Sequence, residues 1–559
     1  MEKYLNQNHI SIHNSQDAIK GRYIKANAFL PRGTVIITSQ PLGTVAIPQM
    51  MNEYCNYCFR KQTSPPLQRC SQCKKAYFCD MACFKNAWLS YHQFVCTAQS
   101  NHQCAEDELD LEMLERVALN VARYRQRNKM NKESVEDGET VEVTMEAFFS
   151  LMGHDTLQPR HITERNTALA RKTLERKIFQ GISQEELVHY LNVFRSNNFS
   201  ITDVELFAIG EGTYPIASLF NHSCHPNAVV MFEGALACIR AIEDIQPGTE
   251  ITIPYIDPAH SRKYRQTLLH QKYFFDCQCE RCLENANRPY LSKIDTLLGE
   301  EESDWDRAEQ LLLEYNHKHI DKRAQILKEI EIWNLLDMCQ KYDRRHDGFP
   351  DHALTIASYS HYFVQFFSPY LLTCNQPELH LLGPSSSKTS CSLTDFDDPL
   401  PSQARPKVPS TCDDIMATSI DKMLSYDSTA DSLLIIPYRL STLSICTRLF
   451  YDLISEGKWQ NAVKVGLYIL VQYCVIYPPY HPMLAQHFLI MAKAGWNSIV
   501  QSELLVVGDK GLEKVYERGV RRWIVSAKET IAVAFGKQSK LWKEILELEW
   551  IFLREQKLK

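Results

Sequence analysis

The chain has 559 residues, with 61 Lys and Arg against 67 Asp and Glu, which gives a formal net charge of -6. This length exceeds the size at which a single hydrophobic core usually stops growing, so we expect roughly two to four structural units. The small negative charge excludes a global basic field that would gather nucleic acid or an anionic membrane. Binding of nucleic acid would therefore be weak and confined to a local patch.

The N-terminus and the apolar stretches indicate a protein that is neither exported nor inserted in a membrane. Residues 1–17 lack the apolar run of a signal peptide, and the longest apolar stretch, residues 465–477, contains Gln472 and is too short to span a bilayer. Most of the 19 cysteines lie in tight pairs, which in a large chain without an export signal favours metal ligation over disulfides. We expect a soluble monomer in the cytoplasm, the nucleus or both.

In chain order, residues 17–48 alternate short apolar runs with turn residues, which predicts small antiparallel strands. A compact cysteine-rich unit follows from Cys55 to Cys96. Apolar residues then recur at helical spacing over residues 107–124 and 184–195, and the polar stretch 128–139 between them is typical of a loop.

Strand and turn signals return over residues 197–257, where the apolar segments 228–239 and 251–253 indicate a small irregular β domain. After Cys282 the pattern is helical, with a Ser/Pro/Asp-rich stretch at 383–414 that we predict to be a disordered loop. Residues 459–492 resemble a degenerate tetratricopeptide-like hairpin of two helices, without a strict repeat.

The strongest signal is a set of four short ligand pairs. Each short loop can direct two thiolates, or a thiolate and an imidazole, at one ion, so eight ligands supply two tetrahedral zinc sites. Such closed sites contribute folding energy rather than chemistry. The alternative is a set of buried structural cysteines or a redox cluster. The pairs are Cys55 with Cys58, Cys70 with Cys73, Cys79 with Cys83, and His92 with Cys96.

The same segment carries six Lys and Arg against two acids between residues 53 and 96, a local excess of four positive charges. That excess could contact a phosphate backbone or an acidic peptide, although the pattern favours a merely solvated face.

A third cysteine group lies downstream. Cys277, Cys279 and Cys282 fall within six residues and lack a fourth partner nearby, for which Cys224 is the candidate. A third structural zinc would then close a loop of about fifty residues whose own core is small. The alternative for Cys224 is a plain buried thiol.

Several motifs in one order resemble the SET and MYND domain (SMYD) family of protein lysine methyltransferases, and the resemblance covers nearly the whole chain. The matching segments are 20–26 (KGRYIKA), 30–33 (LPRG), the cysteine-rich unit, 221–228 (NHSCHPNA), 250–255 (EITIPY), 273–282 (YFFDCQCERC) and 477–485 (YPPYHPMLA).

The resemblance implies methyl transfer from S-adenosylmethionine to a lysine of a protein substrate. It also implies interleaved zinc sites in the finger, with Cys55, Cys58, Cys79 and Cys83 on one ion and Cys70, Cys73, His92 and Cys96 on the other.

For the cofactor, the resemblance assigns a first loop, an adenosine clamp and a closing aromatic segment. His154 could instead be a loop histidine, and Lys20 and Arg22 could be solvated turn charges. Tyr23 stands where the family often has glycine, which puts the backbone of the first loop and the cofactor affinity in doubt. The implied contacts are Lys20, Gly21, Arg22, His154, Asn197, Asn221, His222, Tyr273, Phe274 and Phe275.

For the substrate, the resemblance implies an aromatic channel of Phe199, Tyr255, Tyr273 and Phe275, with Tyr255 supplying the catalytic hydroxyl. A free lysine is only about 0.1% neutral near pH 7.5, and a desolvating channel beside a sulfonium favours the neutral amine. The ring faces would attract the cationic product. Core packing is the alternative for Phe199 and Phe275.

The resemblance implies an α+β fold: a small irregular β SET fold interrupted by a MYND zinc finger and a helical insertion, then a zinc region and a helical domain that restricts access or merely caps the fold. The boundaries are 1–50 (SET N-terminal part), 51–97 (finger), 98–195 (insertion), 196–258 (core SET), 259–285 (post-SET zinc region) and 286–559 (tetratricopeptide-like domain).

Three function hypotheses follow. The first is an active lysine methyltransferase acting on histone or other proteins. The second is a weakly active scaffold whose finger binds proline-containing peptides of transcriptional partners. The third is a nucleic-acid binder with a basic finger, against which the net charge argues.

Overall fold

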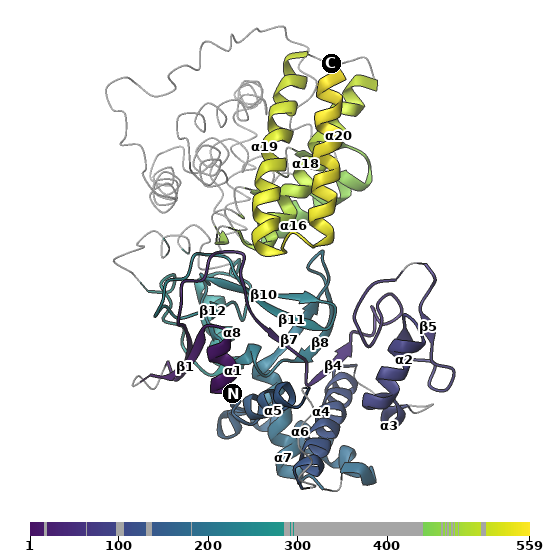
Figure 1. The fold of residues 1–559 in the computed structure, drawn as a ribbon, viewed down its shortest axis with the longest axis vertical. Helices are drawn as coiled ribbons and strands as arrows, with labels where there is room; N and C mark the ends of the chain where they lie inside the picture. The colour runs from purple at the N-terminus through teal and green to yellow at the C-terminus, as the bar shows by residue number, and fades with distance from the viewer. Residues whose placement is uncertain are drawn as a thin grey trace, which may run out of the picture. The chain divides into compact units, whose positions relative to one another are not determined.

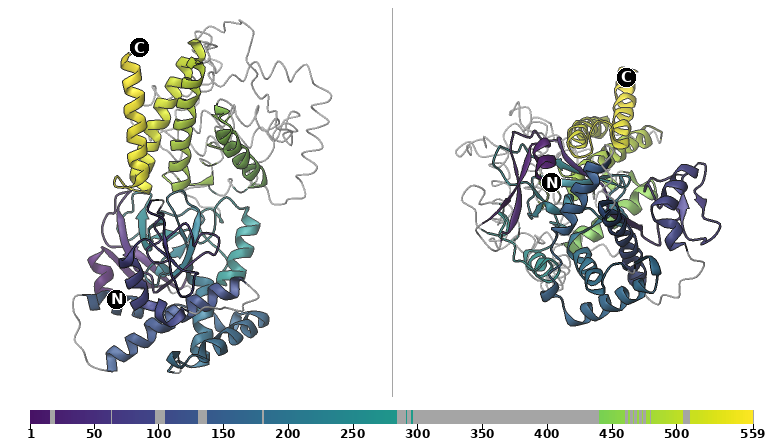
Figure 2. Two further views of the ribbon diagram at one scale, coloured as in Figure 1. Left: turned by 90° about the vertical axis from the view of Figure 1, so that its right-hand side faces the viewer. Right: turned by 60° about the horizontal axis from the view of Figure 1, so that its bottom comes forward.

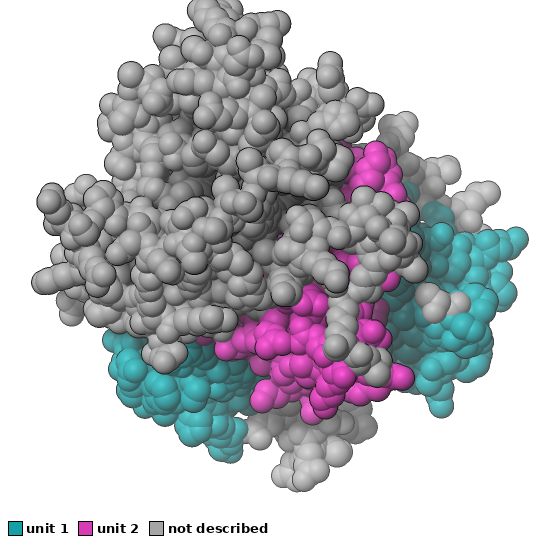
Figure 3. Space-filling view, turned by 90° about the horizontal axis from the view of Figure 1, so that it is seen from above, with its two compact units in different colours: residues 1–222, 226–253, 268–276 teal, residues 223–225, 254–267, 277–559 magenta. Residues whose placement is uncertain are grey.

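The computed structural model describes residues 1–15, 20–62, 64–96, 105–129, 137–179, 181–283, 440–459, 480–504 and 510–558, with isolated residues such as 291 and 295 and scattered positions between 462 and 478. The chain divides into two compact units, coloured in Figure 3. Unit 1 comprises residues 1–222, 226–253 and 268–276, and unit 2 comprises 223–225, 254–267 and 277–559. Figures 1 and 2 show the elements of each unit.

Unit 1 holds short strands, some paired with the next strand along the chain and others, β3 and β4, paired with partners far away in the sequence. β1 (Ile10–Asn14) pairs with β2 (Arg22–Ala26). β3 (Val35–Ser39) pairs with β11 (Leu236–Ala241), which forms a hairpin with β10 (Ala228–Glu233). β8 (Ala208–Thr213) lies between β4 (Gly43–Ala46) and β7 (Asn198–Thr202). The parallel pair of β9 (Asn221–His222) and β12 (Thr252–Ile253) completes the described strands of the β region.

Apolar side chains on these strands form the core of unit 1. Ile24, Ile37 and Ile239 are at most 2% exposed. The β10–β11 turn contains Gly234 at φ +67°, where a Cβ atom would meet the carbonyl oxygen of Cys58 at 2.4 Å. The predicted apolar segment 228–239 is a hairpin of β10 and β11, and glycine is the residue that fits its turn.

Helices cover the β region in Figure 1: α1 (Glu2–Gln7), α4 (Ala105–Lys129), α5 (Asp137–Phe149), α6 (Arg160–Leu174) and α7 (Gln184–Asn197). α7 begins with a capping box between Ser183 and Glu186. The prediction of helices over 107–124 and 184–195 is confirmed. The predicted loop 128–139 is too long at both ends, because α4 runs to Lys129 and α5 begins at Asp137.

The cysteine-rich segment adds a hairpin of β5 (Gln68–Arg69) and β6 (Tyr77–Phe78), followed by α2 (Met81–Ala87), the π-helical turn η1 (Trp88–His92) and α3 (Gln93–Val95). Its buried apolar side chains are few beyond its cysteines, so packing alone gives this segment little core.

Unit 2 contains α16 (Leu440–Ser455), α18 (Pro482–Leu504), α19 (Lys510–Ala534) and α20 (Lys540–Leu558), while α8 (Arg262–Tyr273) belongs to both units. α18, α19 and α20 run side by side (Figures 1 and 2). α18 approaches α19 closely at Gly495, where a Cβ atom would meet Val520 at 2.8 Å and Trp523 at 2.9 Å.

The mixed α+β composition is confirmed, and the described C-terminal segments are helical. Residues 383–414 lie outside the described residues, as does much of the first helix of the predicted 459–492 hairpin. The domain boundaries given above stay predictions. Among the described helices, none combines the length and the apolar character needed to cross a membrane.

Candidate functional site

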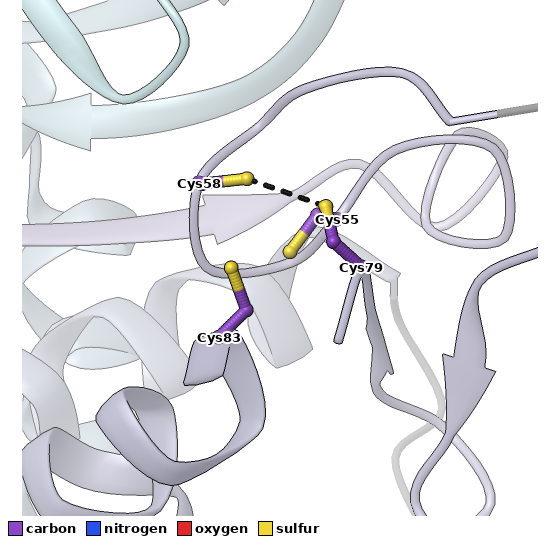
Figure 4. Close-up of side chains that lie close together, drawn as sticks. All are labelled: Cys55, Cys58, Cys79 and Cys83. Carbon is purple, nitrogen blue, oxygen red and sulfur yellow. Dashed lines mark hydrogen bonds between the residues drawn. The ribbon is translucent and has the colours of Figure 1, made fainter. Parts of the chain in front are cut away.

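The first cysteine cluster of the finger brings four sulfur atoms together, as Figure 4 shows. Cys55 and Cys58 come from one loop, Cys79 follows β6, and Cys83 lies in the first turn of α2. Their ligand atoms all lie within 4.8 Å of one another, and Cys58 Sγ is 3.5 Å from Cys79 Sγ. The implied grouping of these four residues is therefore found in the structure.

The second cluster groups Cys70, Cys73, His92 and Cys96, all of them buried and again within 4.8 Å. Cys70 Sγ lies 3.8 Å from Cys96 Sγ, and Cys73 Sγ lies 3.7 Å from His92 Nε2. The interleaving that the resemblance implied is thus reproduced by the fold.

Local backbone geometry directs these side chains. Phe59 and Lys74, which follow the second cysteine of each Cys-x2-Cys loop, adopt φ +58° and +56°. Asp80 caps α2 by accepting a hydrogen bond from the Cys83 amide at 2.7 Å, which orients the first turn of the helix that carries Cys83.

The donor sets fit zinc, which takes four Cys and His ligands in closed structural sites. Burial raises the pKa of the Cys83 thiol to about 12 and that of Cys96 to about 12; negative charge on Cys55 beside Cys83, and on Cys73 beside Cys96, acts in the same direction. Four sulfurs this close do not remain thiolates together unless a cation compensates their charge. Cys55, Cys58, Cys79 and Cys83 would hold one ion, and Cys70, Cys73, His92 and Cys96 the other.

The third cluster lies in unit 2 and joins Cys224 to Cys277, Cys279 and Cys282. Cys224 Sγ is 4.0 Å from Cys277 Sγ and 3.7 Å from Cys282 Sγ, and the Cys224 amide donates to Cys279 Sγ at 3.4 Å. Gln266 fixes the segment by exchanging two hydrogen bonds with the backbone of Cys277, at 2.8 and 2.9 Å. Cys224 is therefore the partner of the downstream triplet, and the four sulfurs could hold a metal ion.

The predicted cofactor loop and the Asn221 segment lie together in unit 1. Asn221 Nδ2 lies 2.8 Å from the carbonyl oxygen of Arg22, 3.4 Å from that of Lys20 and 3.1 Å from Glu250 Oε1. Gly21, at φ +56°, makes the bend that this clamp holds. β9 carries Asn221 and pairs with β12, so a strand supports the clamp.

Two further contacts fix the same loop. Lys20 Nζ forms an ion pair with Glu250 at 2.6 Å, and Arg22 Nη1 donates to the carbonyl and hydroxyl oxygens of Ser150 at 3.0 and 2.9 Å. Tyr23 lies in extended β2, and the positive φ falls on Gly21 instead. Tyr23 therefore does not strain the backbone of the first loop.

His154 and Phe274 meet in unit 1, with ring centroids 4.9 Å apart, and both residues adopt positive φ, +51° and +61°. Burial lowers the pKa of His154, which favours the neutral imidazole. Asn197 Nδ2 donates to the carbonyl oxygens of Val193 at 2.9 Å and Met152 at 3.2 Å, which joins the end of α7 to the segment that precedes His154.

The aromatic residues divide between the two units. His222 and Phe275 have ring centroids 6.2 Å apart, and Phe199 packs edge-on against buried Tyr214 at 6.1 Å. Burial raises the pKa of Tyr273 to about 12, so its hydroxyl stays protonated at neutral pH. Tyr255 belongs to unit 2, whereas the other predicted channel residues belong to unit 1.

The structure adds polar groups to which the sequence assigned no role. Glu250 opens the 250–255 motif and binds both Lys20 and Asn221. Glu211, on β8, accepts from Asn198 at 2.8 Å, and burial raises its pKa. Burial lowers the pKa of Lys272, whose Nζ lies 5.2 Å from the Tyr273 ring. Only Glu250 lies inside a motif that matches the family, so only its role could have been sought from the sequence.

A sequence model of the SET domain family matches residues 21–256. That segment begins at the Gly21 bend and ends one residue after Tyr255. Residues 21–256 are therefore similar in sequence to a SET domain.

The similar curated proteins are named lysine methyltransferases, which confirms the predicted resemblance to the SET and MYND domain family. They include the histone-lysine N-methyltransferase ASHR1 of Arabidopsis thaliana (32% identity; 48% of this chain, 54% of that one) and the N-lysine methyltransferase SMYD2-A of Xenopus laevis (27%; 50% and 62%). The mouse histone-lysine N-methyltransferase Smyd1 is 28% identical over 47% of this chain and 54% of its own length.

The chain thus spans little more than half the length of the curated relatives it matches. A solved structure described as the SET domain of LSMT bound to lysine and AdoHcy aligns with a TM-score of 0.27 and 13% identity over 53% of this chain and 62% of that chain.

Proposed function

We propose that this chain is an S-adenosylmethionine-dependent protein-lysine N-methyltransferase that contains three structural zinc ions. The observation that carries the proposal is the Asn221 clamp on the Gly21 bend, located inside the segment that matches the SET domain family. It joins two predicted cofactor segments, residues 20–22 and 221–222, that are about 200 residues apart in the sequence.

The bound cofactor supplies the sulfonium methyl group. The task of the chain is then to hold the acceptor lysine in line and to favour its neutral amine. Tyr273 suits a channel wall, because its buried hydroxyl stays neutral and its ring face attracts a methylated ammonium. We assign the catalytic hydroxyl to Tyr255, and a channel wall to Phe199 and Phe275.

The decisive experiment is calorimetric titration of the zinc-loaded full chain with S-adenosylmethionine. Saturable binding that is lost in Asn221→Ala and His222→Ala supports the proposal. Asn120→Ala is the matched control, since the Asn120 side-chain amide donates to the carbonyl oxygen of Leu42 at 2.6 Å and lies outside the clamp. If the folded, zinc-loaded wild-type chain does not bind S-adenosylmethionine, the proposal that it is a methyltransferase is wrong.

A second experiment addresses the catalytic hydroxyl. Tyr255→Phe should retain cofactor binding and lose about a hundredfold or more in transfer of labelled methyl to protein lysines. Unchanged transfer would remove Tyr255 from the mechanism.

The substrates and partners belong to the same proposal. We propose histone or other protein lysines as substrates, proline-containing peptides as ligands of the finger, and a location in the cytoplasm or nucleus. A peptide pull-down that survives Tyr255→Phe but fails after Cys73→Ser would assign the peptide ligand to the finger. Retention on DNA that falls steeply with salt would instead point to nucleic acid.

A further inference from the structure

The third cysteine cluster is flanked by two arginines whose side chains are completely buried. Arg265, on α8, and Arg281, which precedes Cys282, are each 0% exposed, and both contact Asp295, whose side chain is 8% exposed. Buried guanidinium groups are costly unless they are paired and hydrogen-bonded, so this arrangement requires an explanation.

Arg265 has a partner for each of its five N–H groups. Nη1 donates to Asp295 Oδ1 at 2.7 Å and to the carbonyl oxygen of His260 at 2.6 Å. Nη2 donates to Asp295 Oδ2 at 2.8 Å and to Cys282 Sγ at 3.7 Å, and Nε donates to Cys224 Sγ at 3.2 Å. Because a guanidinium has five N–H donors in a fixed fork, no other residue type could make this set.

Arg281 is bound to the same carboxylate without any described contact to sulfur. Its Nη2 donates to Asp295 Oδ1 at 3.1 Å, and its Nη1 lies 3.4 Å from the carbonyl oxygen of Ile476 and 3.5 Å from that of Cys224. The two arginines therefore differ in one respect that can be tested, namely direct donation to the cysteine sulfurs.

The charges explain why sulfur lies beside Arg265. Two guanidinium ions and one carboxylate leave one positive charge buried, which neutral thiols would not compensate. Four thiolates around a divalent ion carry two negative charges, so a metal-bound cluster supplies the anion that Arg265 lacks. In return, the N–H groups of Arg265 stabilise the thiolate form of Cys224 and Cys282.

We propose that Arg265 is the positioning residue of the third metal site: held by Asp295, it donates to the sulfurs of Cys224 and Cys282 and offsets the negative charge of the four-thiolate cluster. The proposal rests on zinc at these cysteines and does not depend on methyl transfer. A chain without enzymatic activity would test it equally well.

The test is competition for zinc between the full chain and a graded series of chelators, with bound zinc measured by mass spectrometry. Cys279→Ser should hold one zinc fewer and thereby identifies the ion of this site. Arg265→Met should bind that ion about 10- to 100-fold more weakly. Arg281→Met is the matched control, and we expect its zinc affinity to stay within about threefold of wild type even if its melting temperature falls.

Equal zinc affinity in wild type and Arg265→Met would overturn the proposal, and so would equal weakening in both methionine variants, since general destabilisation would then be the cause. If Arg265→Met does not fold, Arg265→Lys replaces it. Lysine keeps the charge but lacks the fork, so zinc affinity between those of wild type and Cys279→Ser is expected, and wild-type affinity would overturn the proposal.

Discussion

The finger and the C-terminal helices are stabilised in contrasting ways. In the finger, residues 55–96, eight ligands stand where a core would be, and the strands are two residues long. In α18, α19 and α20 the contacts are made by buried side chains such as Phe488, Trp523 and Ile545. The comparison teaches that one chain can combine a segment with little core, whose folding energy bound metal would supply, with a segment whose folding energy comes from apolar burial.

The largest expected effect is removal of metal from the finger. Structural zinc contributes about 10–16 kcal/mol of apparent binding free energy in finger peptides, far more than this small hairpin could replace. A strong chelator should therefore unfold residues 55–96 while α18–α20 remain folded. Hydrogen–deuterium exchange, measured peptide by peptide, would show the loss of protection in residues 55–96 and its retention in α18–α20. If exchange in the finger is unchanged after metal removal has been verified, metal does not supply the folding energy of this segment.

The second largest effect concerns the helices. Trp523 is 0% exposed and packs against Gly495, so Trp523→Ala should cost about 3–5 kcal/mol in the free energy of unfolding. Trp550, which is 61% exposed on α20, is the matched control, and its alanine variant should change stability by less than about 0.5 kcal/mol. Urea unfolding of the two variants measures the difference, and similar losses in both would contradict this account of packing.

A smaller effect, dependent on pH, follows from His487. Its Nε2 donates to the carbonyl oxygen of Gly466 at 2.7 Å, and burial lowers its pKa to about 4. The folded helices hold the neutral ring while the unfolded chain protonates near pH 6.5. This stability is therefore fully present above about pH 6.5 and is lost progressively as the pH falls toward 4, by up to about 3 kcal/mol.

The measurement for His487 is the free energy of unfolding of the helices between pH 4.5 and 7.5. His487→Gln cannot titrate but can still donate to the carbonyl oxygen of Gly466. Between pH 4 and 6.5, unfolding of this variant should therefore take up about one proton fewer than unfolding of wild type, which flattens the dependence of the unfolding free energy on pH. An identical pH profile in the variant would exclude His487 as its source.

The smallest effect lies in the finger again. Asp80→Ala removes the cap of α2 and should cost about 1 kcal/mol, seen as a lower melting temperature of the finger with two zinc ions still bound. Asp80→Asn should retain most of the cap and serves as the control. A loss of zinc in the alanine variant alone would show that the cap, and not the ligands, limits metal binding.

Short-range patterns in the sequence predicted much of this molecule. The eight finger ligands lie within 42 residues, and spacing alone indicates two metal sites, although it does not assign their interleaving. The helices over 107–124 and 184–195 could be predicted because their apolar residues recur at helical spacing. Each helix buries that one face, so the pattern is visible within a short stretch of sequence.

Long-range contacts could not be predicted in the same way. Nothing near Asn221 indicates that its side chain holds the carbonyl groups of Lys20 and Arg22, and nothing near Asp295 indicates two buried arginines. The close approach of the Cys58 carbonyl to Gly234 likewise comes from a distant loop, so the sequence near Gly234 does not indicate it. Each of these features depends on which distant segments meet, and periodicity carries no such information.

The pairing of β3 with β11 has a consequence for how the protein is made. Ile37 faces Ile239 across that pair, so β3 leaves the ribosome about 200 residues before its partner. At roughly 5–20 residues per second, this interval is about 10 to 40 seconds. The finger is complete at Cys96 and can acquire its zinc early in that interval, while the apolar β3 still lacks its partner. During this stage of synthesis the unpaired β3 of a nascent chain is therefore open to aggregation and to chaperones.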